Sequence, residues 1–133
     1  MDRKNSIRRG TTAVEFALAS PLIFFLLFGA VELARIQFIR HAAENAAYEA
    51  ARYSITPGAT ATTTRDHAVD FMTRVSARDA TAEVTPATLT DSTTEVTVTV
   101  NVPLDRNCWI SPRFSPGYIV SASSTLKTER YRP

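Results

Sequence analysis

The chain has 133 residues and no visible internal repeat, a length that suits one compact domain and excludes a large multi-domain enzyme. Hydrophobic residues make up 44% of the sequence and charged residues 21%, so the composition is globular and excludes wholesale disorder. The first ten residues carry four basic side chains against one acidic, a net charge of +3, and the rest carries eleven against twelve, a net charge of −1. The excess positive charge is therefore an N-terminal signal, and no nucleic-acid partner is expected.

A long uncharged segment follows this basic leader. Residues 16–31 contain no charge and are rich in Leu, Phe and Ile. A helix over this run would be about 24 Å long. The flanking Ala13, Val14, Leu33 and Ala34 extend it to the roughly 30 Å of a bilayer core. A buried core helix is the alternative, but so small a domain cannot cover a helix on every side. The segment therefore predicts a membrane span with the basic end in the cytoplasm and the chain beyond it outside.

A cleaved secretory signal has a similar basic and apolar start. No clear small-x-small cleavage site follows the run, and the helical pattern continues beyond it without a break. Pro21 would kink the helix or remove one backbone hydrogen bond, which membrane helices tolerate. The sequence thus favours an uncleaved span that continues into a longer helix.

The helical pattern continues past the span. Small or apolar residues recur at spacings of three and four, which is typical of one helix face: Ile36, Ile39, Ala43, Ala46, Ala50 and Tyr53, widened by Ala42, Ala47 and Ala51. We expect a helix from about residue 11 to about 54, ended by Thr56-Pro57-Gly58. The small side chains suit packing against other helices or docking onto the protein's own head, and the pattern does not decide between them.

A mixed head is predicted after the helix. A second helix is expected from about 64 to 78, with Thr63 as its cap. Val96, Val98, Val100 and Val102 alternate with polar residues, which predicts a half-buried strand. A neighbouring strand over 82–89 contains Pro86, so it should be an edge or bent strand.

The rest of the head is a loop and a last strand. The loop between Pro103 and Pro116 should be anchored by Trp109 and Phe114, and a last strand should run from about 118 to 131. The predicted fold class is α+β: a long N-terminal helix, one short helix and about three antiparallel strands.

Residues for catalysis or metal binding are not recognisable. His41 and His67 lie in different elements without a metal-ligand spacing, and no nucleophile motif or glycine-rich phosphate loop occurs. We expect no enzymatic activity, cofactor, metal or small-molecule substrate. Cys108 is the single cysteine, so it is expected either to be buried beside Trp109 or to form an intermolecular bond.

The segment Arg8-Arg9-Gly10-Thr11-Thr12-Ala13-Val14-Glu15-Phe16 places a glycine just before the apolar helix and a glutamate five residues after that glycine. This arrangement resembles a type IV prepilin leader. More narrowly, RRGTTAVEFALASPLIFFLLFGAVELAR resembles the N-terminus of the TadE-like family, the pseudopilins of the tight adherence (Flp) pilus. The elements that carry this resemblance are Gly10, Val14-Glu15-Phe16, Pro21, Gly29, Glu32 and Arg35.

The resemblance implies a type IV pilin-like fold and a precursor cut by a membrane prepilin peptidase between Gly10 and Thr11, on the cytoplasmic side. In such proteins the glutamate that corresponds to Glu15 pairs with the terminal amine of a neighbouring subunit and aligns the helices. Simple snorkelling of Glu15 to the headgroups is the alternative. Glu32 and Arg35 lie three residues apart at the outer interface, which predicts an ion pair.

The expected organisation is a cytoplasmic leader over 1–10, a transmembrane and extended helix over 11–56, and an extracytoplasmic head over 57–133. The major Flp pilin is little more than the helix, so the head indicates a minor pseudopilin in pilus assembly and surface adhesion. Its partners would be the membrane, the peptidase, other pilin and pseudopilin subunits and the assembly platform. It would cross the cytoplasmic (inner) membrane once and enter the pilus after assembly. The alternative is a permanently anchored envelope domain, never cleaved, with a binding or scaffolding role.

Overall fold

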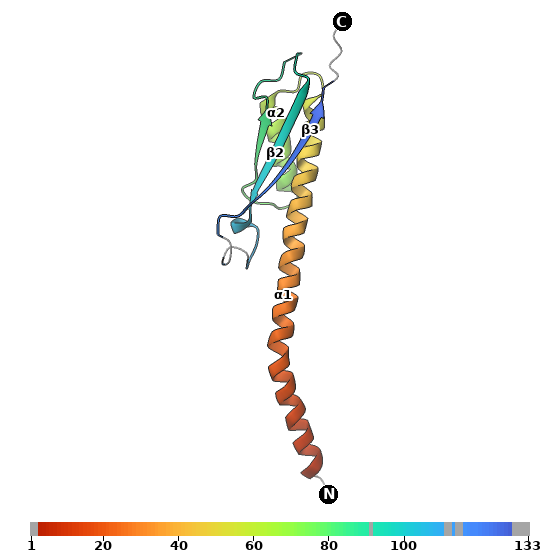
Figure 1. Ribbon diagram of the computed structural model, residues 1–133, viewed down its shortest axis with the longest axis vertical. Helices are drawn as coiled ribbons and strands as arrows, with labels where there is room; N and C mark the ends of the chain where they lie inside the picture. Colours follow the sequence, from red (N-terminus) through yellow and green to blue (C-terminus); the bar gives the residue numbers. More distant parts are fainter. Residues whose placement is uncertain (1–2, 91, 111–112, 114–115, 129–133) are drawn as a thin grey trace. The chain divides into compact units, whose positions relative to one another are not determined.

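The computed structural model describes residues 3–90, 92–110, 113 and 116–128 of the chain. The elements follow in the order α1 (Arg3–Ser54), α2 (Ala61–Arg74), β1 (Thr81–Thr85), β2 (Glu95–Pro103), the short 3₁₀ helix η1 (Leu104–Arg106) and β3 (Ile119–Lys127) (Figure 1). This set of elements confirms the predicted α+β fold. The chain divides into two compact units, Met1–Ala34 and Arg35–Pro133.

The first unit is described from residue 3 and consists of α1 alone. Helix α1 begins at Arg3 rather than near residue 11, since one glycine at position 10 costs a helix only about 1 kcal/mol relative to alanine. Pro21 lies inside the helix and does not end it. The apolar segment is therefore helical throughout, as a membrane span requires.

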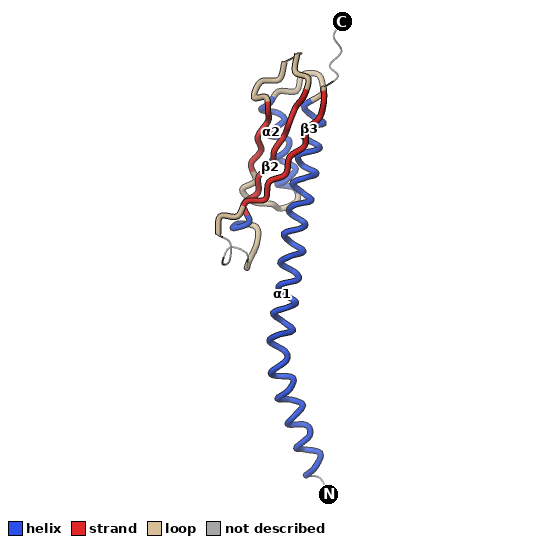
Figure 2. Tube along the Cα trace, viewed as in Figure 1, coloured by secondary structure: helices blue, strands red, loops and turns tan. Residues whose placement is uncertain are grey.

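The second unit contains a three-stranded antiparallel sheet in the order β1-β2-β3 (Figure 2). Strand β2 is central, and Val98 pairs with Val84 of β1 and with Ser124 of β3. Val96, Val98, Val100 and Val102 are buried, while the residues between them face outward. The alternating pattern in the sequence therefore predicted both the strand and its buried face.

Residues 35–54 of α1 belong to the second unit, and together with α2 they pack against the buried face of this sheet. The core joins the valines of β2 with Met72 of α2 and with a row of residues on α1 that consists of one isoleucine and six alanines: Ile39, Ala42, Ala43, Ala46, Ala47, Ala50 and Ala51. Alanines let the helix backbone come close to its neighbours. Of the two packing alternatives for this face, the structure supports docking onto the protein's own head.

Helix α2 starts and ends earlier than the sequence predicts. Thr60 is its cap: the Thr60 Oγ1 accepts from the Thr63 N–H at 3.2 Å, and the Thr63 Oγ1 accepts from the Thr60 N–H at 3.0 Å. Thr63 is thus the third residue of a reciprocal capping box and not the cap itself. The helix stops at Arg74, just before Ser76, whose φ of 60° is left-handed.

The other strand bounds differ from the predictions in small ways. Strand β1 is an edge strand, as expected, but it ends at Thr85 because Pro86 has no N–H for the ladder. Strand β3 is described to its end at Lys127, and the predicted extension over 129–131 lies outside the described residues.

The prediction that Trp109 anchors the loop is wrong, because its side chain is 70% exposed. Cys108 is buried. Of the two alternatives for this cysteine, burial or an intermolecular bond, the structure supports burial. The Cys108 N–H bonds the Leu104 carbonyl at 2.9 Å at the end of η1, and Leu104 is also buried. This turn directs the next residue, Trp109, outward. Phe114, the other predicted anchor, lies outside the described residues.

Candidate functional site

The first candidate site is the apolar part of α1 in the first unit. Large side chains are exposed along it, including Phe16, Leu18, Leu22, Phe25 and Leu33. The apolar window has a mean hydropathy of 2.1, and none of it is buried inside the structure. Residues 10–34 would extend about 37 Å as a helix, enough for a bilayer core of roughly 30 Å. By length and composition this helix can cross a membrane, and such a surface needs lipid or other helices to cover it.

The residues of the predicted cleavage and alignment site lie on neighbouring turns of this helix. Gly10 is surrounded by open space, since a Cβ placed there would meet nothing within 4 Å. Thr11 and Glu15 are four residues apart, so they share one helix face, and Glu15 is exposed. The structure therefore places a small accessible residue and an unburied carboxylate within two turns.

The ion pair predicted between Glu32 and Arg35 stays a prediction. Glu32 is 7% exposed. Arg35 Nε donates a hydrogen bond to the backbone oxygen of Asn107, a residue that lies 72 positions further along the chain. This contact ties the first residue of the second unit to the turn that follows η1.

Asn107 is the centre of a hydrogen-bond network that sequence reasoning did not find. Its side chain is buried, and its Nδ2 donates to the Arg78 carbonyl at 2.9 Å and to the Pro103 carbonyl at 2.7 Å. Its Oδ1 accepts from the Arg78 N–H at 2.8 Å. Asn107 therefore joins the α2–β1 loop to the end of β2 and, through its backbone, to α1. Sequence patterns did not reveal this network, because Arg78 and Arg35 lie 29 and 72 residues from Asn107.

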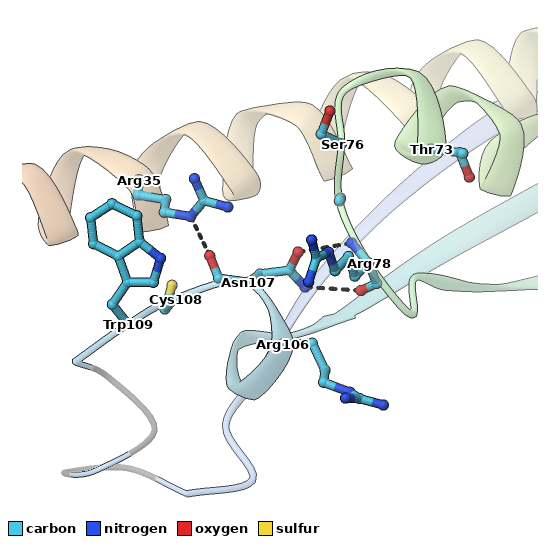
Figure 3. A pocket seen from close by; sticks show the side chains of 9 residues that line it. Arg35, Thr73, Ser76, Arg78, Arg106, Asn107, Cys108 and Trp109 are labelled. Atoms are coloured by element: carbon cyan, nitrogen blue, oxygen red, sulfur yellow. Dashed lines mark hydrogen bonds between the residues drawn. The ribbon is translucent and has the colours of Figure 1, made fainter.

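An open cleft of about 530 Å³ lies beside this network, entirely within the second unit (Figure 3). Arg35, Arg78 and Arg106 line it together with Trp109, and the described lining residues include no Asp or Glu. Arg106 Nε pairs with the Asp79 carboxylate at 2.9 Å, with both side chains mostly exposed. The cleft is therefore cationic, with an aromatic side chain at one wall.

The described residues offer no metal site, since no group of three His, Cys, Asp or Glu side chains comes together among them. Tyr53 and His67 stack with ring centroids 4.9 Å apart, which accounts for that histidine as a packing residue between α1 and α2. The chemistry that these residues support is association through apolar and cationic surfaces.

Comparison with known proteins gives one finding, and it falls on α1. The family described as TadE-like protein matches residues 10–52. No curated protein and no protein of solved structure matches the chain. The family match begins at Gly10 and ends two residues before the end of α1. This match confirms the resemblance to the TadE-like family over about a third of the chain, within α1.

Proposed function

We propose that this protein is a minor pseudopilin of a tight adherence pilus, a structural subunit and not an enzyme. Its helix crosses the cytoplasmic membrane once. The basic residues before the span stay in the cytoplasm, because Lys and Arg near a span are retained on that side. The head lies outside and takes part in pilus assembly and surface adhesion. The observation that carries the proposal is the uncovered apolar helix whose family match begins at Gly10.

The proposal includes removal of the leader by a prepilin peptidase, which hydrolyses the peptide bond between Gly10 and Thr11. Two observations support this position. The family match excludes the nine residues before Gly10, and the space around Gly10 is open. A peptidase at the membrane face needs such close access to the backbone, which a glycine gives.

The test replaces Gly10 with a bulky residue and follows the size and N-terminus of the protein in cells that contain the peptidase. We expect the unchanged chain to begin at Thr11 and the Gly10→Phe variant to keep its leader. Gly29→Phe is the matched control, since Gly29 lies in the same helix and also has open space around it. An added Cβ meets nothing within 4 Å at either position, so a difference between the two variants reports processing. An intact leader on the unchanged chain would contradict the proposal and favour the permanently anchored domain.

Glu15 is proposed to align the subunit by pairing with the terminal amine of a neighbouring pilin or pseudopilin. Its support is its position, since a carboxylate inside an apolar span is costly and by default marks function. We expect Glu15→Gln to be processed normally but to co-purify poorly with pilus subunits, while Glu15→Asp, which keeps the charge, recovers much of the association. Equal co-purification of the Gln variant and the unchanged chain would show that Glu15 only reaches to the headgroups.

In this proposal, cleavage removes a segment of charge +3 and leaves a mature chain of charge −1. The basic cytoplasmic flank that holds the helix in its orientation is lost. The assembly platform can then draw the subunit out of the membrane toward the fibre. The basic character of the precursor is a feature of topology and is absent from the assembled subunit.

A further inference from the structure

The cationic cleft of the second unit lies where the chain leaves the apolar span. Arg35 lines the cleft, and it is the first basic residue after the uncharged run of residues 16–31. A helix that buries residues 13–34 in a bilayer brings Arg35 to the level of the headgroups. Arg35 follows the span directly in the sequence, so at least this residue of the cleft lies near the headgroups when residues 13–34 are in the bilayer.

One arginine of the cleft, Arg106, forms an ion pair with Asp79. Arg35 keeps the N–H groups of its terminal nitrogens as donors, since its hydrogen bond to Asn107 uses only Nε. Arg78 is exposed, and its contacts with Asn107 are made through its backbone. The Arg106–Asp79 pair is exposed at 71% and 57%, and pairs of this kind are weak and exchange readily. Arginine binds phosphate oxygens by two parallel hydrogen bonds, which makes this cluster suited to a phosphate group.

Amphipathic aromatic side chains accompany the arginines. Trp109 is 70% exposed at the wall of the cleft, and Tyr118, at the other end of the same β2–β3 connection, is 57% exposed. The ends of this connection are held together, because the Leu104 N–H bonds the Tyr118 carbonyl at 2.9 Å and the Asp105 carboxylate accepts from the Gly117 N–H at 3.0 Å. Trp and Tyr are enriched at membrane–water interfaces, where a ring can be apolar at one end and wet at the other. The turn at η1 thus presents Trp109 beside the arginines, a combination that suits a membrane–water interface.

We propose that the cleft formed by Arg35, Arg78, Arg106 and Trp109 binds the phosphate of an anionic phospholipid headgroup. The head thereby docks on the bilayer that its own helix crosses. This inference rests on the membrane-spanning part of the proposed function. The docking is electrostatic and reversible, so it holds the head against the membrane until the subunit is drawn out. Free phosphate and an acidic segment of another protein are the other occupants that the cleft could accept, and the test separates them.

The experiment uses the full chain in vesicles of phosphatidylcholine brominated near the headgroup, with or without an equal amount of phosphatidylglycerol. Trp109 is the only tryptophan of the sequence, so its emission and its quenching by bromine report this position alone. We expect strong quenching with phosphatidylglycerol, weak quenching without it, and a decline as salt is added. The variant Arg78→Gln/Arg106→Gln should weaken docking roughly 25-fold, because each arginine near an anionic surface contributes roughly fivefold.

The control variant Arg52→Gln/Lys127→Gln removes the same charge from exposed positions elsewhere in the second unit and should quench as the unchanged chain does. Equal quenching of Trp109 in vesicles with and without phosphatidylglycerol would overturn the proposal. An equal loss of quenching in the two double variants would overturn it as well. So would a Trp109 emission shift with inorganic phosphate in phosphatidylcholine vesicles, which would assign the cleft to free phosphate. Quenching that appears only with an added acidic protein would assign it to that partner.

Resistance of each variant to alkaline carbonate extraction is measured in the same samples. A chain that is extracted does not span the membrane, which would refute the proposed function itself. A chain that resists extraction but shows no dependence on phosphatidylglycerol would refute the docking alone.

Discussion

Replacing Asn107 by alanine tests whether the network around it holds the head together. The change removes three side-chain hydrogen bonds, of 2.7, 2.8 and 2.9 Å, from a residue that is 2% exposed. A typical protein hydrogen bond contributes about 0.5–1.5 kcal/mol, so the three together give about 2–4 kcal/mol. Cys108 is the next residue and is buried, so its reaction with a thiol reagent reports opening of this region. We expect Asn107→Ala to accelerate labelling of Cys108 roughly 30- to 700-fold, since each 1.4 kcal/mol is a factor of ten.

The assay uses the full chain in detergent micelles, with labelling followed by mass. Asn101→Ala is the matched control. Asn101 lies on β2 and accepts one hydrogen bond, from the Ser121 Oγ at 2.6 Å, on the outer face of the sheet. Its loss should change the labelling rate by roughly 2- to 12-fold. Equal rates for the two variants would refute the central role of Asn107.

Two further predictions concern the core of the second unit and use the same labelling assay. Ala46 is fully buried, so Ala46→Leu should lower the free energy of unfolding by about 1–3 kcal/mol through overpacking. Ala30→Leu, at an exposed position of α1, should have no such effect, and equal effects would contradict close packing at Ala46. The Thr64 Oγ1 is buried without a hydrogen-bond partner among the described residues, so Thr64→Val should raise that free energy by about 1 kcal/mol. The same change at exposed Thr62 should give no gain, and a loss at Thr64 would show that its hydroxyl is satisfied.

The parts of the fold that the sequence predicted are those with a strong local period. The alternation over Val96–Val102 identified the central strand, and the spacing of alanines identified the buried face of α1. The ends of helices were harder to predict where several neighbouring residues could each act as the cap. Thr60 and Thr63 are chemically equivalent caps, and only the backbone geometry selects Thr60.

The cleft could not be predicted for a different reason. Asn107 bonds Arg78 and Arg35, which are 29 and 72 residues away. Nothing local to Asn107 distinguishes it from any other asparagine at the end of a turn. The exposure of Trp109 was missed because its size and hydrophobicity favour burial, whereas the turn at η1 buries Cys108 and directs the next residue outward. Long-range contacts thus create the cationic cleft of the head.

The packing of α1 also limits how subunits can associate. The alanine face from Ile39 to Ala51 is occupied by the protein's own sheet and by α2. Within α1 the broad exposed apolar surface is therefore that of residues 10–34. Under the proposed function, lipid covers this surface before assembly and other helices cover it in a fibre. Exchanging lipid for helices brings little hydrophobic gain, because lipid tails are as apolar as the side chains that they cover. A carboxylate in that segment gains far more from a positively charged partner. Under the proposed function, pairing of Glu15 is thus the step that makes subunit association favourable, and the apolar surface supplies shape complementarity.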